Sequence, residues 1–141
     1  MKIVHLADLH LGYRAYYRLD PHGFNLREMD VLTAFREALR KIAEINPDLI
    51  IIAGDVFHKP RPSNLTIFQT IHRLAVFRSH CKAPIVIISG NHECVKTMES
   101  GNVLNIIERV IPDTLLVDGD IKELEFKNLD TLVVGVPYNA L

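Results

Sequence analysis

Three short apolar runs, each of which stops abruptly, constrain the fold of this 141-residue chain more than any other feature. The runs occupy residues 3–7, 49–53 and 85–88 and are rich in isoleucine, valine and leucine. Continuous apolar runs of this length are typical of strands that are buried on both faces, as in a parallel sheet. We therefore expect at least three buried parallel strands.

Amphipathic segments between these runs predict two helices. Apolar residues recur at three- and four-residue spacing over residues 29–42 and again over residues 67–77. Asn25 is expected to cap the first helix, with Glu28 returning the hydrogen bond, and Ser63 is expected to cap the second. The order strand, helix, strand, helix, strand predicts right-handed crossovers and a parallel sheet.

A different pattern follows residue 100. A short helix is predicted at residues 103–109, and strands are predicted at 115–117, 121–126 and 132–136. Short Asp-Gly and Asn-Leu-Asp turns between these strands favour an antiparallel meander. We therefore predict an α/β fold in which a βαβαβ parallel sheet continues into an antiparallel meander, all within one domain over residues 1–141.

Composition narrows the class of protein only modestly. Hydrophobic residues make up 48% and charged residues 23% of the chain, as in soluble globular domains. Asp8 interrupts the first apolar run, so we expect neither a signal peptide nor a membrane span. Cys81 and Cys94 lack the spacing of a zinc site and indicate free thiols in a reducing compartment, hence a cytoplasmic protein. The formal net charge of −1 indicates that any bound polyanion is held locally.

Residues that can bind metal ions follow each of the three predicted strands. Asp8 and His10 follow the first strand, Asp55 follows the second, and Asn91 and His92 follow the third. Because the carboxyl ends of parallel strands form one edge of a sheet, these side chains are expected to converge there. Carboxylate, imidazole and amide groups suit divalent ions such as Mn²⁺, Fe²⁺ or Zn²⁺, and Asp55 is placed to bridge two ions held ~3.5–4 Å apart.

Each of these motifs is weak when it stands alone, because aspartate commonly ends a strand by accepting hydrogen bonds from turn amides. All three in order, each at the end of an apolar strand, favour a two-metal phosphoesterase site. The glycines that precede Asp55 and Asn91 are expected to let the backbone turn sharply beside the metals.

Three motifs carry a resemblance to a known family. They are His-Leu-Ala-Asp-Leu-His-Leu-Gly at 5–12, Gly-Asp-Val-Phe-His-Lys-Pro-Arg-Pro-Ser at 54–63 and Gly-Asn-His-Glu at 90–93. They resemble the opening motifs of the calcineurin-like metallophosphoesterases. More narrowly, they resemble the nuclease subunit of the double-strand-break repair complex, of the meiotic-recombination-eleven or SbcD type. The 54–63 motif narrows the family, because phosphoprotein phosphatases lack it, and the resemblance spans residues 3 to about 137.

The resemblance implies a role for each residue of the predicted site. Asp8 and His10 would bind the first metal, Asp55 would bridge both metals, and Asn91 would bind the second. His92 would be the catalytic histidine that stabilises the transition state or protonates the leaving 3′ oxygen, as suits an imidazole near neutral pH. The implied fold is the N-terminal half of a metallophosphoesterase β-sandwich with flanking helices.

DNA-contacting residues are also implied. His58 would contact the phosphate or ribose and position the strand, and Lys59 and Arg61 would contact the backbone. Arg14 lies in a segment of alternating aromatic and basic residues, 13–18, that suits either base stacking and phosphate contact or a plain solvated loop.

Two departures from the family pattern bear on the site. Glu93 stands where the family has aspartate, as the carboxylate that would orient His92. No histidine follows His92, whereas the family completes its site with three more. The resemblance therefore implies an N-terminal fragment, with the remaining ligands and a DNA-capping domain beyond Leu141.

The leading hypothesis is the N-terminal part of a two-metal, Mn²⁺-dependent DNA exonuclease and endonuclease of double-strand-break repair. The family implies DNA, a second copy of the chain and an SMC-like ABC ATPase as partners, with the two early helices as the dimer surface, in the nucleoid or a nucleus. A generic calcineurin-like phosphatase or cyclic phosphodiesterase is one alternative, against which Phe57, His58 and residues 61–63 count. A non-catalytic DNA-binding scaffold is the other, supported only by the absent histidines.

Overall fold

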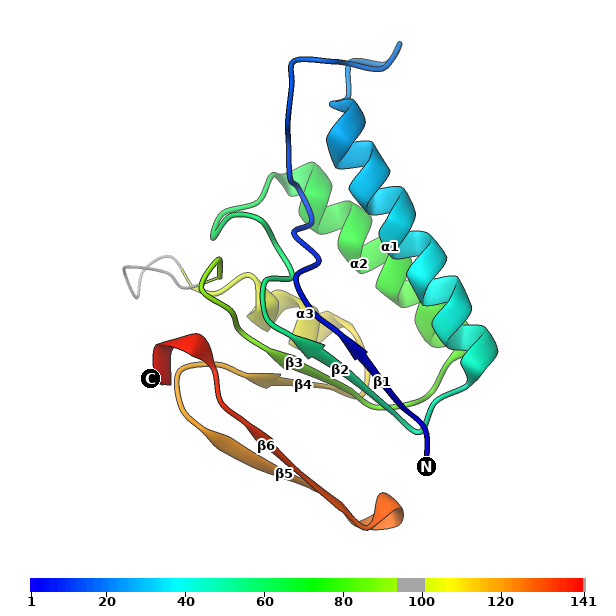
Figure 1. The fold of residues 1–141 in the computed structure, drawn as a ribbon, viewed down its shortest axis with the longest axis vertical. Helices are drawn as coiled ribbons and strands as arrows, with labels where there is room; N and C mark the ends of the chain where they lie inside the picture. The colour runs from blue at the N-terminus through cyan, green and yellow to red at the C-terminus, as the bar shows by residue number, and fades with distance from the viewer. Residues whose placement is uncertain (94–100, 141) are drawn as a thin grey trace.

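A parallel sheet that carries helices on one face and a β-hairpin on the other forms the frame of the molecule (Figure 1). The computed structural model describes residues 1–93 and 101–140. The sheet has the order β1-β2-β3-β4, and all its neighbouring strands run parallel. Its strands are β1 (Ile3–Leu6), β2 (Leu49–Ala53), β3 (Ile85–Ile88) and β4 (Thr114–Val117). The three strands predicted from the apolar runs are confirmed.

Both faces of this sheet are buried over its central strands, which explains why the strand sequences are apolar without alternation. Ile50, Ile52 and Ile87 face the helices and belong to the larger hydrophobic core. Leu49 and Val86, which are completely buried, face the opposite way, toward the hairpin. Full burial of each such side chain stabilises the fold by about 1.5–3 kcal/mol.

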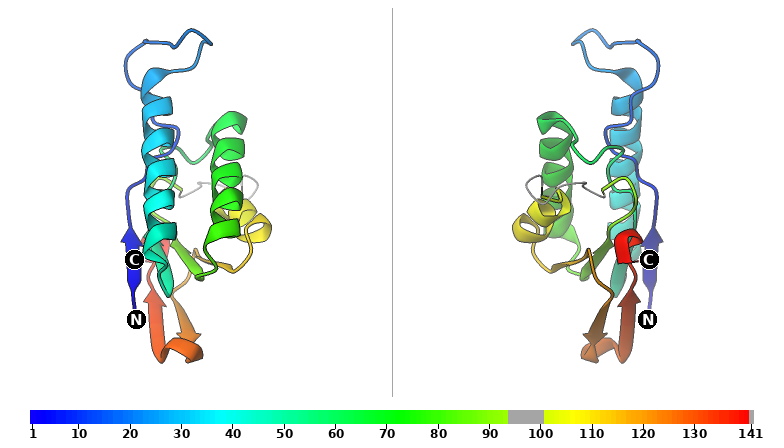
Figure 2. Two further views of the ribbon diagram at one scale, coloured as in Figure 1. Left: turned by 90° about the vertical axis from the view of Figure 1, so that its right-hand side faces the viewer. Right: turned by 90° about the vertical axis from the view of Figure 1, so that its left-hand side faces the viewer.

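The helical layer consists of α1 (Leu26–Ile45), α2 (Asn64–His80) and α3 (Leu104–Val110). Figure 2 shows α1 and α2 side by side, with α3 beside α2. All three helices contribute to the larger core. None of the helices in the described ranges combines the length and apolar character needed to cross a lipid bilayer.

The predicted helix caps are present, with one difference. Asn25 accepts hydrogen bonds from the amides of Arg27 and Glu28, and Ser63 accepts one from Thr66. The Glu28 carboxylate makes other contacts than the expected return bond to Asn25. It is buried beneath the helix and accepts hydrogen bonds from Arg14 and Thr66.

The C-terminal third differs from the prediction in its strand directions. The predicted strand at 115–117 exists as β4, but its placement in an antiparallel meander is wrong, because β4 pairs parallel to β3. Its position after α3 in the chain gives a further strand–helix–strand unit, which returns β4 in the direction of β3. Only β5 (Lys122–Phe126) and β6 (Thr131–Gly135) pair antiparallel, and a 3₁₀ turn at Lys127–Leu129 joins them.

The hairpin packs against the second face of the sheet through Leu124, Phe126 and Val133. The contact is close at Gly135, where a Cβ atom would lie 2.7 Å from Cγ2 of Val117. This second layer confirms the sandwich architecture implied by the resemblance. A 3₁₀ turn at Tyr138–Ala140 follows β6. Of the two cysteines, Cys81 is a buried free thiol, and Cys94 lies outside the described residues.

Candidate metal centre

The loops that follow β1 and β2 extend the pairing of these strands beyond the sheet. The amide of Asp8 donates to the carbonyl of Gly54 at 3.2 Å, and the amide of His10 donates to that of Asp55 at 2.9 Å. Leu11 continues the pattern with a 2.8 Å bond to Val56. These backbone bonds place Asp8 and His10 directly beside Asp55, as expected for residues that follow neighbouring parallel strands.

The third loop lies against the second at Gly90. A Cβ atom at this position would lie 2.1 Å from Oδ1 and 2.5 Å from the backbone nitrogen of Asp55. Any side chain would therefore displace Asp55. The preceding loop turns at Gly54, whose φ of +85° favours glycine. The two glycines singled out in the sequence thus allow the loops to approach each other.

Asp8, His10 and Asp55 form the first group that can hold a metal ion. One ligand atom from each lies within 4.8 Å of the others. The Nε2 atom of His10 is 3.8 Å from Oδ1 of Asp8 and 3.9 Å from Oδ2 of Asp55. The side chain of Asp8 is 73% exposed and that of Asp55 is 11% exposed, so the group has a buried side and an open side.

His10, His58 and His92 form a second such group. The His10 and His92 ring centroids are 4.7 Å apart, and those of His58 and His92 are 5.2 Å apart. His10 belongs to both groups, so the carboxylate and histidine clusters are continuous. His58, expected from the resemblance only to contact substrate, therefore lies among the potential ligands.

The ring of His92 is oriented by a backbone carbonyl. Its Nδ1 atom lies 2.6 Å from the carbonyl oxygen of His58. Because a carbonyl oxygen only accepts, Nδ1 carries the proton, and Nε2 has a lone pair to offer when the ring is neutral. The orientation of His92 thus depends on His58, and the expected bond from Glu93 to His92 is absent from the hydrogen bonds of the described residues.

Burial and the neighbouring imidazoles of His92 and His10 lower the pKa of His58. Lys59 acts in the same direction, and Asp55 opposes it. The ring therefore holds its proton less readily than an ordinary histidine, which suits a metal ligand or hydrogen-bond acceptor.

Three residues of the centre have left-handed backbone conformations. The φ angles of Asp8, His10 and Asp55 are 55°, 46° and 51°. Such conformations cost non-glycine residues of order 1–3 kcal/mol and cluster at functional sites, although aspartate and histidine tolerate them better than most. Here the interstrand hydrogen bonds maintain them.

The remaining sequence-predicted residues of the third loop differ in environment. Asn91 is exposed at the loop surface. Glu93 is 1% exposed, and its carboxylate accepts hydrogen bonds from the amides of Phe57 and Gly90. Burial raises the pKa of Glu93, and these two hydrogen bonds act in the opposite direction.

The three basic residues proposed to contact DNA line one pocket of about 230 Å³ at the start of α2. They are Arg14, Lys59 and Arg61. At its base, Glu28 accepts a hydrogen bond from Nε of Arg14 at 2.6 Å and another from Oγ1 of Thr66 at 2.7 Å. The role of Glu28 was missed in the sequence, where only its position in the first turn of the helix was visible.

The donor set fits divalent metal ions. Carboxylates and imidazoles together bind Mn²⁺, Fe²⁺ and Zn²⁺. Asp8, His10 and Asp55 offer one set of donors, and the histidine group offers a second that shares His10.

The fold and this donor set define a metal-dependent phosphoesterase domain. Residues 1–135 match the family model described as calcineurin-like phosphoesterase, so the chain belongs to this family, whose members bind divalent metals.

Among its relatives are archaeal proteins named DNA double-strand break repair protein Mre11. The one from Methanococcus maripaludis is 35% identical over 98% of this chain, and that from Methanocaldococcus jannaschii is 30% identical over 85%. The SbcD component of the nuclease SbcCD from Staphylococcus epidermidis is 36% identical over 72% of the chain. The chain spans 35%, 32% and 25% of the lengths of these three relatives.

Proposed function

We propose that this chain is the N-terminal part of a DNA nuclease of double-strand-break repair that hydrolyses phosphodiester bonds with two Mn²⁺ ions. The observation that carries the proposal is the continuity of the two ligand groups through His10, beside a pocket lined by basic side chains. The names of the relatives, a break-repair protein and a nuclease component, support the choice of DNA as substrate.

Asp8 and His10 would hold one ion, Asp55 would contact both, and Asn91 would contribute to the second. When bound, such ions lower the pKa of a water molecule and stabilise charge on the phosphate oxygens. The mixture of carboxylate and imidazole donors supports Mn²⁺, an ion for which softer sulfur ligands are not needed.

His92 would donate a proton to the leaving 3′ oxygen. Its Nδ1–H is held by the carbonyl oxygen of His58, which orients the ring and leaves Nε2 as the atom that exchanges a proton with substrate. The His58 ring, with Tyr13 against it at a centroid distance of 4.8 Å, would contact the phosphate or ribose.

Arg14, Lys59 and Arg61 would bind phosphates of the DNA backbone. They line a single pocket, and Lys59 and Arg61 follow His58 closely in the chain. Because the chain carries a formal net charge of −1, this local group would supply the positive field that holds a polyanion.

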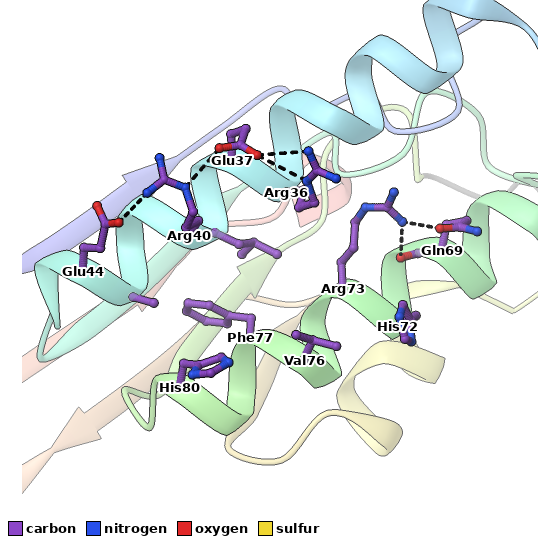
Figure 3. A pocket seen from close by; sticks show the side chains of 12 residues that line it. Arg36, Glu37, Arg40, Glu44, Gln69, His72, Arg73, Val76, Phe77 and His80 are labelled. Carbon is purple, nitrogen blue, oxygen red and sulfur yellow. Dashed lines mark hydrogen bonds and ion pairs between the residues drawn. The ribbon is translucent and has the colours of Figure 1, made fainter. Parts of the chain in front are cut away.

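We further propose a homodimer and an SMC-like ABC ATPase partner. The face formed by α1 and α2 supports an association through helices. Exposed apolar side chains on α2 include Phe68 and Val76. A groove of about 830 Å³ runs between α1 and α2 (Figure 3). Phe77 and Val76 lie in the groove between ion pairs such as Arg40 with Glu37 on α1 and the Arg73–Gln69 pair on α2.

The test is to express the protein from its complete native reading frame and offer it linear duplex DNA, a phosphomonoester and a cyclic nucleotide. Mn²⁺-stimulated cleavage of the DNA is expected. Hydrolysis restricted to the other two substrates would instead identify a generic phosphatase or cyclic phosphodiesterase. DNA binding without metal binding or hydrolysis would identify a scaffold module.

A further inference from the structure

Glu93 is a buried carboxylate that joins two loops of the metal centre from behind. Its Oε1 atom accepts a hydrogen bond from the amide of Phe57 at 2.7 Å, and its Oε2 atom accepts one from the amide of Gly90 at 2.9 Å. The whole residue is 1% exposed. Phe57 belongs to the loop after β2 and Gly90 to the loop after β3, so one side chain is bonded to both loops.

These two loops carry most of the proposed ligands. Asp55 and His58 lie on either side of Phe57, and His92 lies two residues after Gly90. On the ligand side, the loops meet where the amide of His92 donates to Oδ1 of Asp55 at 3.1 Å. The loops are thus connected on two sides, by Asp55 in front and by Glu93 behind.

The carboxylate is chemically suited to this position. The two amides point toward the same buried point, and an ionised carboxylate accepts through both oxygens without carrying a donor. A neutral amide side chain of equal length would satisfy one backbone N–H and turn its own NH₂ group toward the other. Removal of the side chain would leave both amides without their acceptor.

We propose that Glu93 is a positioning residue of the metal centre, which sets the separation between the Asp55–His58 loop and the Gly90–His92 loop by binding the Phe57 and Gly90 amides together. The proposal rests on the proposed metal centre but does not require that the substrate be DNA. It gives Glu93 a role different from orienting the ring of His92, which the His58 carbonyl performs.

The test compares Mn²⁺ binding by calorimetry in the whole protein for wild type, Glu93→Gln and Glu93→Ala. Circular dichroism at the titration temperature verifies that each variant is folded. Loss of contacts behind metal ligands typically weakens metal affinity by about 10- to 100-fold. A graded loss is expected, smaller for Gln, which keeps one acceptor, than for Ala, which keeps none.

Glu108→Gln is the matched control. Glu108 also accepts a hydrogen bond from a backbone amide, that of Leu116 at 2.8 Å, but it lies on α3 outside the ligand loops. This variant is expected to bind Mn²⁺ as wild type does. Equal affinity of the folded Glu93 variants and wild type would overturn the proposal, whereas failure of wild type to bind Mn²⁺ would overturn the metal centre itself.

Hydrogen exchange in the metal-free wild type gives a second measurement that needs no variant. The amides of Phe57 and Gly90 are expected to exchange slowly and with similar protection, because one carboxylate binds both. Rapid exchange at either amide would overturn the proposal even if the Glu93 variants failed to fold.

Discussion

The carboxylate of Asp55 accepts a hydrogen bond from the backbone amide of His92 at 3.1 Å, across 37 positions of sequence. The residue proposed to contact both metals therefore also holds the loop that carries the proposed proton donor. Metal binding and the placement of His92 are expected to depend on each other, and the following variants separate the two effects.

Gly90→Ala is expected to abolish metal binding, because the new Cβ atom would lie 2.1 Å from Oδ1 and 2.5 Å from the backbone nitrogen of Asp55. Mn²⁺ titration measures the loss. Gly119→Ala serves as the control, since Gly119 has a φ of +77° but open space around it. The control is expected to lose about 1 kcal/mol of stability and to retain metal. Wild-type metal affinity in Gly90→Ala would contradict the close packing of the two loops.

Asp55→Asn is expected to lower both metal stoichiometry and activity, because a neutral amide is a poorer ligand than a carboxylate for two ions. Asn still accepts the His92 amide through its side-chain oxygen, so the loop contact is largely preserved. Metal content after dialysis, measured by elemental analysis, tests the prediction. An unchanged stoichiometry would exclude the bridging role of Asp55.

His92→Ala is expected to lose turnover by roughly 100-fold or more while keeping bound metal, since general acid catalysis typically contributes 10²–10⁴-fold. Single-turnover cleavage of duplex DNA and parallel Mn²⁺ titration measure the two quantities. His22→Ala, at an exposed loop position, is the control and should cleave normally. Cleavage by His92→Ala at the wild-type rate would remove His92 from the mechanism.

Lys59→Ala and Arg61→Ala are each expected to weaken DNA binding and to reduce the slope of log K against log salt concentration by about one. The loss follows from removing one phosphate contact, so metal affinity should stay unchanged. Fluorescence anisotropy at several salt concentrations measures the slope. Lys127→Ala is the control, because Lys127 is 85% exposed on the hairpin turn. A slope equal to that of the control would exclude the pocket as a backbone contact.

Local patterns in the sequence were sufficient for the helices, the first three strands and the convergence of Asp8, His10 and Asp55. Apolar runs and helical spacing report burial directly, and the caps at Asn25 and Ser63 depend on residues only a few positions away. The strand-edge rule then brings the metal-type residues together, because parallel strands share one carboxyl edge.

Only the tertiary structure decided which groups those residues contact. The partners of Glu93, Glu28 and the His92 ring lie 36, 38 and 34 positions away in sequence. The direction of β4 was likewise decided by its pairing with β3. Such contacts depend on how packed elements meet in space, whereas spacing along the chain reports only the period of a single element. The sequence by itself determined where the metal-type side chains gather, and the packing of the loops determined which of them are ligands and which hold the ligands in place.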